Sequence, residues 1–245
     1  MSEINQNDDP SMDDEDDVMF GETALTTDKP RPAHARFLKP APDATDPLWI
    51  SKVKLNTRNV RVQAALADSY IMHCLVQGEV FPEKRGRMLH RVQQGRNEVL
   101  LYVVSPNEPD WTPFRRIAIT AEKKAWTPKF TKDSLLRFQI TASPSVQIGV
   151  KDRNNKTLHF YEQNDQEEWL RVRFFDRGAE VVEVTAGRWS RLVCDKPGAN
   201  VYELAVPFSG VLRVKDPVML AHATRYGVGR GKAFGLGMLT LARAQ

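Results

Sequence analysis

Residues 225–237 read Arg225-Tyr-Gly-Val-Gly-Arg-Gly-Lys-Ala-Phe-Gly-Leu-Gly237, and a short, mostly apolar run follows. Glycine lacks a Cβ atom, which lets backbone N–H groups approach an anion closely. The glycines are Gly227, Gly229, Gly231, Gly235 and Gly237, and the cations beside them are Arg225, Arg230 and Lys232. The pattern predicts a phosphate-binding loop that closes into a final strand.

Two nucleotide-binding motifs do not fit these glycines. A dinucleotide-binding fingerprint requires a helix and a second strand after it, but only eight residues follow Gly237. A P-loop aligned on Lys232 would have Tyr226 at its first glycine position and Ala233 where Ser or Thr holds magnesium. We therefore expect a polyphosphate backbone as the ligand. A tight helix-to-strand connection without a ligand is the alternative.

Charge is distributed unevenly along the 245 residues. Residues 1–47 carry twelve acidic and four basic side chains, a net charge of −8. The formal net charge of the whole chain is +4, so residues 48–245 carry +12. A body this basic favours a polyanionic partner such as nucleic acid.

The two cysteines, Cys74 and Cys194, stand 120 positions apart. This spacing fits neither a zinc site nor a disulfide framework, which favours a reducing compartment. The N-terminal residues are acidic, and the aliphatic run at 100–104 is far shorter than a membrane span. The sequence therefore predicts a cytoplasmic protein with no metal site and no membrane partner.

The first half of the chain has the order β-α-β-β. Residues 1–47 combine the acidic run with six prolines and little apolar periodicity, which predicts a disordered acidic tail with order beginning at Leu48. Apolar periodicities predict a strand at 48–55, a helical region between Val60 and Phe81, and a hairpin of 87–92 with 98–104. Residues 111–130 lack clean periodicity, and we expect them to lead to a second unit.

The second half repeats this order. A strand at 135–141 precedes a hairpin of 146–150 with 157–161, and a capping-box pattern at 164–167 predicts a helix start. Strands at 180–185, 189–193 and 201–214 and a helix capped by Asp216-Pro217 lead to the glycine loop. The fold class predicted is α+β, with two tandem ferredoxin-like (RRM-like) domains at 48–130 and 131–245.

Several segments carry a family resemblance. They are Ser51-Lys-Val-Lys-Leu-Asn56, Ala67-Asp-Ser-Tyr-Ile-Met-His73, residues 208–217 and the glycine loop at 227–237, with support from 109–111 and 137–144. On these segments, residues 48–245 resemble the CasE family, the type I-E CRISPR-associated endoribonucleases of the RAMP superfamily. The chain departs from that family in its acidic tail, in Ser143-Pro144 where Asn-Pro is usual, and in Leu236 where a cysteine is frequent.

The resemblance implies that the protein cleaves CRISPR repeat RNA without a metal or any other cofactor. The 2′-OH attacks its own 3′-phosphate, which leaves a 2′,3′-cyclic phosphate and a 5′-OH. Tyr70 and His73 are three residues apart and share one helix face, so both can meet the same phosphodiester. We expect His73 to be the general acid–base and Tyr70 to position the 2′-OH, because an imidazole titrates near neutrality. We expect the glycine loop and Lys232 to hold phosphates.

The expected partners are a CRISPR repeat RNA hairpin and the other subunits of a type I-E-like surveillance complex, with target DNA reached only through that complex. A-form stems are recognised mainly through shape and phosphates. The basic residues that we expect to grip the stem are Lys151, Arg153 and Lys156 at a hairpin tip, together with Arg85 and Arg87. Surface solvation is the alternative for each. The alternative function is a repeat-hairpin-binding subunit that cuts slowly or not at all.

Overall fold

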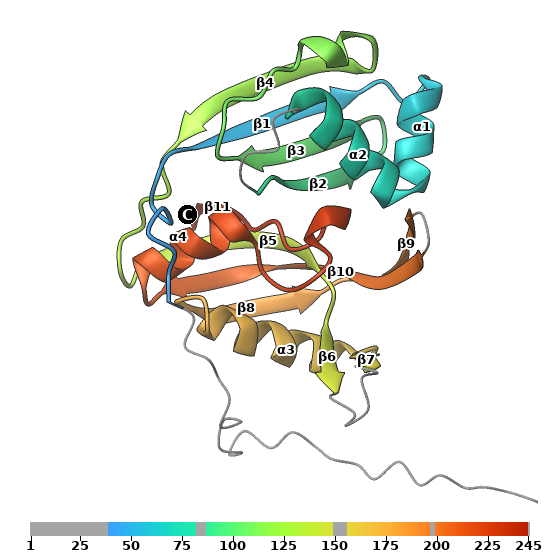
Figure 1. The fold of residues 1–245 in the computed structure, drawn as a ribbon. Helices are drawn as coiled ribbons and strands as arrows, with labels where there is room; N and C mark the ends of the chain where they lie inside the picture. Colours follow the sequence, from blue (N-terminus) through green and yellow to red (C-terminus); the bar gives the residue numbers. More distant parts are fainter. Residues whose placement is uncertain (1–38, 82–86, 149–155, 197–198, 245) are drawn as a thin grey trace, which may run out of the picture. The chain divides into compact units, whose positions relative to one another are not determined.

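The computed structural model describes residues 39–81, 87–148, 156–196 and 199–244, and it contains two antiparallel sheets with their helices (Figure 1). The first sheet has the strand order β2-β3-β1-β4. Its elements are β1 (Leu48–Leu55), α1 (Val60–Ala67), α2 (Ser69–Val80), β2 (Leu89–Gln94), β3 (Val99–Ser105), the 3₁₀ turn η1 (Thr112–Arg116) and β4 (Ala118–Trp126). The predicted hairpin of β2 and β3 is confirmed, with Val92 opposite Leu101.

The core of the first unit lies between this sheet and the α1–α2 pair. Val53 and Leu101 from the sheet and Met72 and Val76 from α2 are buried there, and Phe114 of η1 closes the cluster. This packing fixes α2 along its length, so residues on its other side are held in place over the second unit.

The predicted helical region at 60–81 is two helices. Asp68 has an extended backbone, with φ −133° and ψ 116°, and its side chain accepts a hydrogen bond from the Tyr70 amide. An aspartate at the N-cap satisfies amides that a new helix leaves free. Asp68 therefore ends α1 and begins α2 five residues before His73.

The prediction that residues 111–130 only connect the two units is wrong for 118–126. These residues form β4, which pairs with β1 along its length and completes the first sheet. Seven of the nine residues of β4 are exposed, so an alternation of apolar and polar residues, the usual sign of a half-buried strand, is missing.

The second sheet has the order β11-β5-β10-β8, and β9 pairs with the far part of β10. Its elements are β5 (Leu135–Ala142), α3 (Gln163–Phe175), β8 (Ala179–Ala186), β9 (Ser190–Lys196), β10 (Ala199–Val214), α4 (Pro217–Tyr226), the 3₁₀ turn η2 (Lys232–Phe234) and β11 (Thr240–Arg243). In both sheets the last strand lies beside the first, the first beside the third, and the third beside the second. The predicted tandem ferredoxin-like fold is confirmed.

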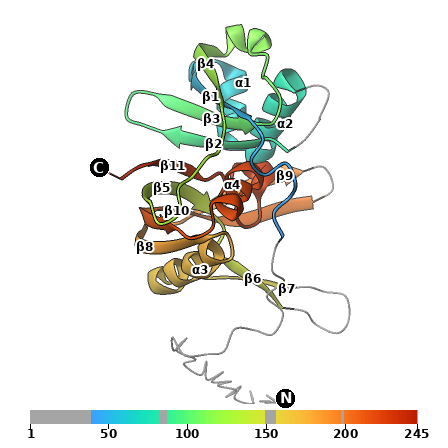
Figure 2. The ribbon, with the colours of Figure 1, turned by 90° about the vertical axis from the view of Figure 1, so that its left-hand side faces the viewer.

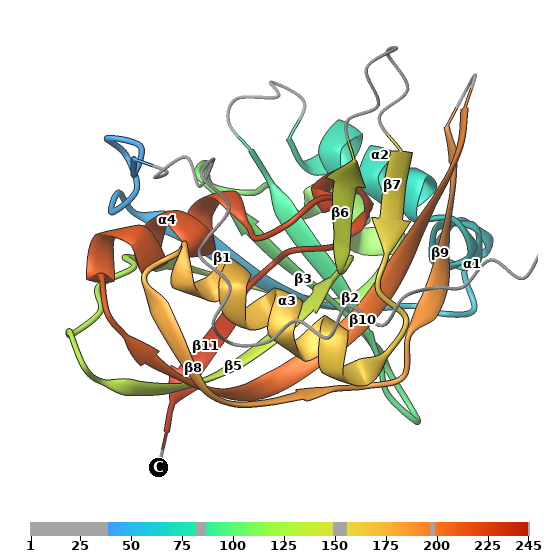
Figure 3. The same cartoon turned by 90° about the horizontal axis from the view of Figure 1, so that it is seen from below.

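A two-stranded ribbon of β6 (Ser145–Ile148) and β7 (Lys156–His159) is inserted between β5 and α3, as predicted. Figure 3 shows that this ribbon and the β9–β10 hairpin extend to the same side. One core joins α3, α4 and the sheet, because Leu170, Phe174 and Leu220 bury against Phe138 and Leu212.

The capping box predicted at 164–167 does not form. The N-cap of α3 is Glu162, and its side chain makes no capping bond. The Glu167 carboxylate instead accepts hydrogen bonds from the Gln163 side chain and the Ala186 amide. The cap predicted for α4 is confirmed, since Asp216 accepts from two amides of its first turn.

Packed structure extends upstream of Leu48, where we expected order to begin. Residues 41–46 form turns, and this segment runs beside α4 (Figure 2). Ala44 is buried. The Asp43 carboxylate accepts hydrogen bonds from the Arg225 Nε at 3.0 Å and from the Tyr226 hydroxyl. Most of the tail predicted at 1–47, namely residues 1–38, lies outside the described residues. None of the described helices is long and apolar enough to cross a membrane.

Candidate functional site

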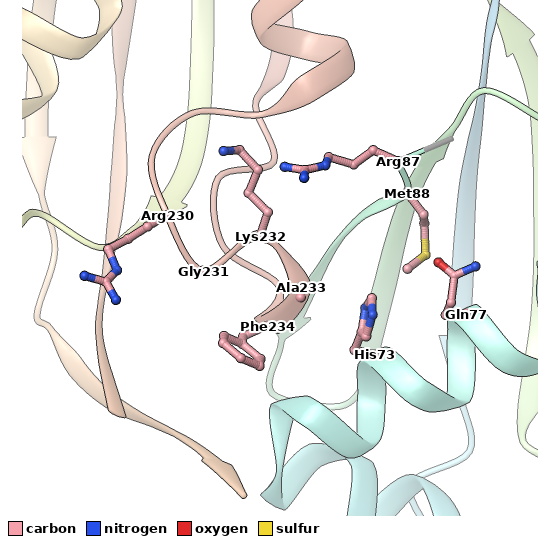
Figure 4. Close-up of a pocket in the computed structure, with 9 residues that line it drawn as sticks. All are labelled: His73, Gln77, Arg87, Met88, Arg230, Gly231, Lys232, Ala233 and Phe234. Carbon is pink, nitrogen blue, oxygen red and sulfur yellow. The ribbon is translucent and has the colours of Figure 1, made fainter. Parts of the chain in front are cut away.

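His73 and the glycine loop line one cavity of about 460 Å³ (Figure 4). His73 comes from the middle of α2 in the first unit, and the loop connects α4 to β11 in the second. The lining residues are His73, Gln77, Arg87, Met88, Arg230, Gly231, Lys232, Ala233 and Phe234. The structure thus brings together the residue that we expected to transfer protons and the loop that we expected to bind phosphate.

The backbone of the loop has conformations that glycine adopts easily and other residues do not. All five have φ between 71° and 84°, a region that side chains with a Cβ disfavour. At Gly237 a Cβ atom would lie 2.3 Å from the Val228 carbonyl oxygen, and at Gly231 it would lie 2.7 Å from Leu236. The loop is therefore tightly folded on itself.

Part of the loop's backbone remains available to a ligand. The amides of Gly227, Val228 and residues 234–237 donate to backbone carbonyls, and one of these bonds ties Gly237 to Thr141 of β5. The amides of residues 229–233 donate to no backbone carbonyl in the part of the chain that the structure describes. These amides lie where the loop borders the cavity, and free amides of this kind bind anions.

Lys232 is held under the loop, where its ammonium donates to the Gly229 carbonyl. Burial, and then the charges of Arg87 and Arg177, lower the pKa of Lys232 to about 8. Figure 4 shows the Arg87 guanidinium extending toward the Lys232 side chain. Cations that repel one another in a partly buried site create a strong preference for an anion.

Arg230 joins the loop to the rest of the second unit. Its Nε lies 2.8 Å from Oε1 of Glu203, whose side chain is only 2% exposed, and its Nη1 donates to Thr157 Oγ1 of β7 at 2.7 Å. The Ser143 hydroxyl donates to the other carboxylate oxygen of Glu203 at 2.8 Å. Arg230 still lines the cavity, but it points away from His73 (Figure 4).

Arg225 lies elsewhere. It is buried, its Nε bonds to Asp43, and its Nη1 reaches the Asp46 carbonyl at 3.4 Å. It is not among the residues that line the cavity. Here Arg225 fastens the segment before β1 to the end of α4.

The imidazole of His73 is half-buried. Its Nδ1 is buried and has no hydrogen-bond partner among the described residues, so Nε2 is the nitrogen that can reach the cavity. Burial lowers the pKa of His73, and the ring is therefore neutral at pH 7. A neutral imidazole can accept a proton from a substrate hydroxyl.

Tyr70 is not among the residues that line the cavity, although it lies one turn before His73 on α2. A hydrogen bond with the Cys74 side chain, more than any other cause, raises the pKa of Tyr70. The phenol is therefore protonated at neutral pH. The structure does not bring Tyr70 and His73 to the same surface of the cavity.

Most of the basic residues predicted to grip an RNA stem lie outside the described residues, namely Lys151, Arg153 and Arg85. Lys156 begins β7, and only its backbone is described. Arg87 is exposed and lines the cavity just before β2.

Sequence reasoning missed Gln77 and His90. Gln77 follows His73 by one turn of α2 and lines the same cavity, so the helical spacing that linked Tyr70 to His73 could have found it. His90 of β2 is 1% exposed, and its ring stacks against that of His73. Within the described residues, no group of three or more His, Cys, Asp or Glu side chains could hold a metal ion.

The chain is similar to several known proteins in sequence and in fold. A family model described as "CRISPR associated protein" matches residues 48–243. The CRISPR-associated endoribonuclease Cse3 of Thermus thermophilus is 29% identical over 213 residues, which cover 80% of this chain and all of the relative. The structure of Thermus thermophilus Cse3 bound to an RNA representing a pre-cleavage complex has a TM-score of 0.71 at 27% identity, covering 80% of this chain and 98% of the other. A chain of a CRISPR RNA-guided surveillance complex, pre-nicking, has a TM-score of 0.61 at 25% identity, covering 80% and 100%.

Proposed function

The chain belongs to the family of CRISPR-associated proteins, as its resemblance to CasE indicated, and we propose that it is an endoribonuclease of CRISPR repeat RNA. It cuts the precursor transcript within each repeat and keeps hold of the repeat hairpin. The observation that carries this proposal is the convergence of His73 and the glycine loop on one cavity. The similarity to Cse3 bound to RNA supports it.

The reaction is an internal transesterification. The ribose 2′-oxygen loses its proton and forms a bond to the adjacent phosphorus, while the bond from phosphorus to the 5′-oxygen breaks. The 5′-oxygen takes up a proton, so the products are a 2′,3′-cyclic phosphate and a 5′-OH. No metal or cofactor is required by this scheme.

His73 is the proton-transfer group. In the free protein its ring is neutral, because burial lowers its pKa, and Nε2 can accept the proton of the 2′-OH. A phosphate bound beside it raises that pKa again, and the protonated ring can donate to the leaving 5′-oxygen. Either transfer contributes about 10²–10⁴-fold to the rate.

Lys232, Arg87 and the free amides of the loop stabilise the charge that develops on the phosphorane. They are held in place before the substrate arrives, so they need no rearrangement during the reaction. Among these groups, the charge of Lys232 is stabilised most by the bound substrate, because Lys232 is partly buried among cations and has no anionic partner in the described residues.

Tyr70 is the second catalytic candidate. Its protonated phenol bonds to Cys74 in the free protein. When it exchanges Cys74 for RNA, it can donate a hydrogen bond to the 2′-OH or to a phosphate oxygen, but it cannot act alone as a base at neutral pH.

The RNA hairpin remains bound after cleavage, and the protein becomes a subunit of a guided surveillance complex in the cytoplasm. Target DNA meets the protein only through that complex. The similarity to a chain of a surveillance complex supports this membership.

The test is incubation of the purified full chain with end-labelled repeat RNA in EDTA. The proposal expects one cut per repeat, with product ends that carry a cyclic phosphate. Tight hairpin binding without turnover over hours would instead favour the alternative, a structural subunit that binds the repeat and does not cut it.

A further inference from the structure

A second cavity of about 680 Å³ borders the glycine loop. It shares Arg230, Gly231 and Phe234 with the cavity of His73, so these loop residues form a wall common to both. Its other walls come from residues 143–147, from α3, from Arg177 and from Glu203 of β10, which all belong to the second unit. Neither His73 nor Tyr70 lines it.

Three arginines line this second cavity, and only one of them has a carboxylate partner. Arg230 is paired with Glu203. Within the described residues, Arg173 and Arg177 form no ion pair. Arg173 lies over the ring of Trp169, with 5.6 Å from its Cζ to the ring centroid, which holds its charged end at the cavity wall.

Arg177 is the more constrained of the two. It is half-buried, and its Nη1 lies 3.3 Å from Nδ1 of His222. Burial, followed by the charge of Arg173, lowers the pKa of Arg177 against the opposing effect of the Asp176 charge, and the charge of Arg177 in turn lowers the pKa of Lys232. A partly desolvated guanidinium without an ion-pair partner is costly, and an anion in the cavity would reduce that cost.

We propose that Arg177, together with Arg173, forms a second subsite for RNA backbone phosphate in this cavity, separate from the phosphodiester that is cut. The inference rests on the proposed function, because it names a further contact of the same RNA. The loop then serves phosphates on both sides, with the amides of residues 229–233 between them.

This subsite contributes to binding and not to chemistry. Of the two catalytic candidates, His73 lines only the other cavity, and Tyr70 lines neither cavity. Removing the charge of Arg177 should therefore weaken binding of RNA, while the cleavage rate of bound RNA stays the same.

The experiment measures the affinity of the full chain for repeat RNA that carries a 2′-deoxy nucleotide at the mapped cut, between about 50 and 200 mM salt. Wild type is compared with two variants, Arg177→Met and Arg173→Met. Because the Arg173 side chain is exposed, we expect Arg173→Met to fold normally. The matched control is Arg171→Met, an arginine of α3 that bonds to the Val181 carbonyl and lines neither cavity.

The proposal expects the slope of log affinity against log salt to fall by about 1 in Arg177→Met and in Arg173→Met, and to stay unchanged in Arg171→Met. The single-turnover rate on cleavable RNA at saturating enzyme should stay within about twofold of wild type, which is a negligible change on a catalytic scale. Unchanged slopes in both variants overturn the proposal, and so does a large loss of the saturated cleavage rate. If wild type itself binds no repeat RNA, it is the proposed function that fails.

Discussion

The rings of His73 and His90 lie 6.1 Å apart between centroids, at an interplanar angle of 27°. The Nδ1 atoms of both rings are buried and have no hydrogen-bond partner among the described residues. His90 lies deeper, and burial, followed by the charge of His73, lowers its pKa to about 3. His90 therefore stays neutral, and its uncharged ring packs against that of His73, the catalytic candidate.

Replacement of His90 by phenylalanine should flatten the acid dependence of stability. The folded-state pKa of His90 is lower than its unfolded value, so the unfolded chain binds more protons and stability falls as pH drops from about 6.5 toward 3. His90→Phe removes this contribution and keeps a flat ring. Urea unfolding between pH 7 and 5 measures it, and an identical slope in wild type and variant would contradict the assignment.

Lys232 should make RNA affinity depend on pH above 8. Its pKa in the free protein is about 8, and a bound phosphate raises that value, so binding takes up a proton above pH 8. Affinity should fall by up to about tenfold per pH unit there. Binding of uncleavable repeat RNA at pH 7 to 9.5 measures it. Lys232→Met should bind more weakly at every pH and lose this dependence, and a variant that keeps the wild-type dependence would refute the assignment.

Removing Arg230 should lower the stability of the fold more than removing its ion-pair partner Glu203. Glu203→Gln leaves a half-exposed guanidinium that water can solvate, and we expect a loss of about 1–3 kcal/mol in the free energy of unfolding. Arg230→Met leaves a buried carboxylate beside Ser143 and should cost about 3–5 kcal/mol. Denaturant unfolding of both single variants and the double variant tests this order, and the reverse order would contradict it.

Two glycines offer a matched test of the loop. Gly237→Ala should destabilise the protein by about 1–3 kcal/mol or more, because its φ is 78° and its Cβ would meet the Val228 carbonyl. Gly78→Ala should stabilise it by about 0.5–1 kcal/mol, because Gly78 is on α2 with nothing within 4 Å of its Cβ position. Thermal melting compares the two, and equal effects would show that the loop tolerates a Cβ.

Sequence patterns predicted the elements whose cause is local. Most strands of the two sheets alternate or run apolar, and Asp216-Pro217 begins α4 as a cap and first-turn proline do. The glycine loop was predictable because five closely spaced glycines are typical of a backbone with positive φ, and all five have it. The strand β4 was missed because an exposed edge strand carries no burial pattern.

The parts of the site that sequence could not give depend on distant contacts. Arg225 looks like the other cations of the loop, but Asp43, 182 positions away, turns it from the cavity. Glu203, which holds Arg230, belongs to β10 and carries no motif. Tyr70 is on the same helix as His73 and three residues before it, but its side chain bonds to Cys74 and does not line the cavity.

The most direct test of the central claim is single-turnover cleavage of repeat RNA in EDTA by wild type, by His73→Ala and by Ile71→Ala, a control at an exposed position of the same helix. We expect wild type and Ile71→Ala to cut all-ribose RNA and to leave RNA with a 2′-deoxy nucleotide at the cut intact. His73→Ala should be slower by about 10²–10⁴-fold while still binding the hairpin. Cleavage of the deoxy substrate, or an undiminished rate in His73→Ala, would contradict the account.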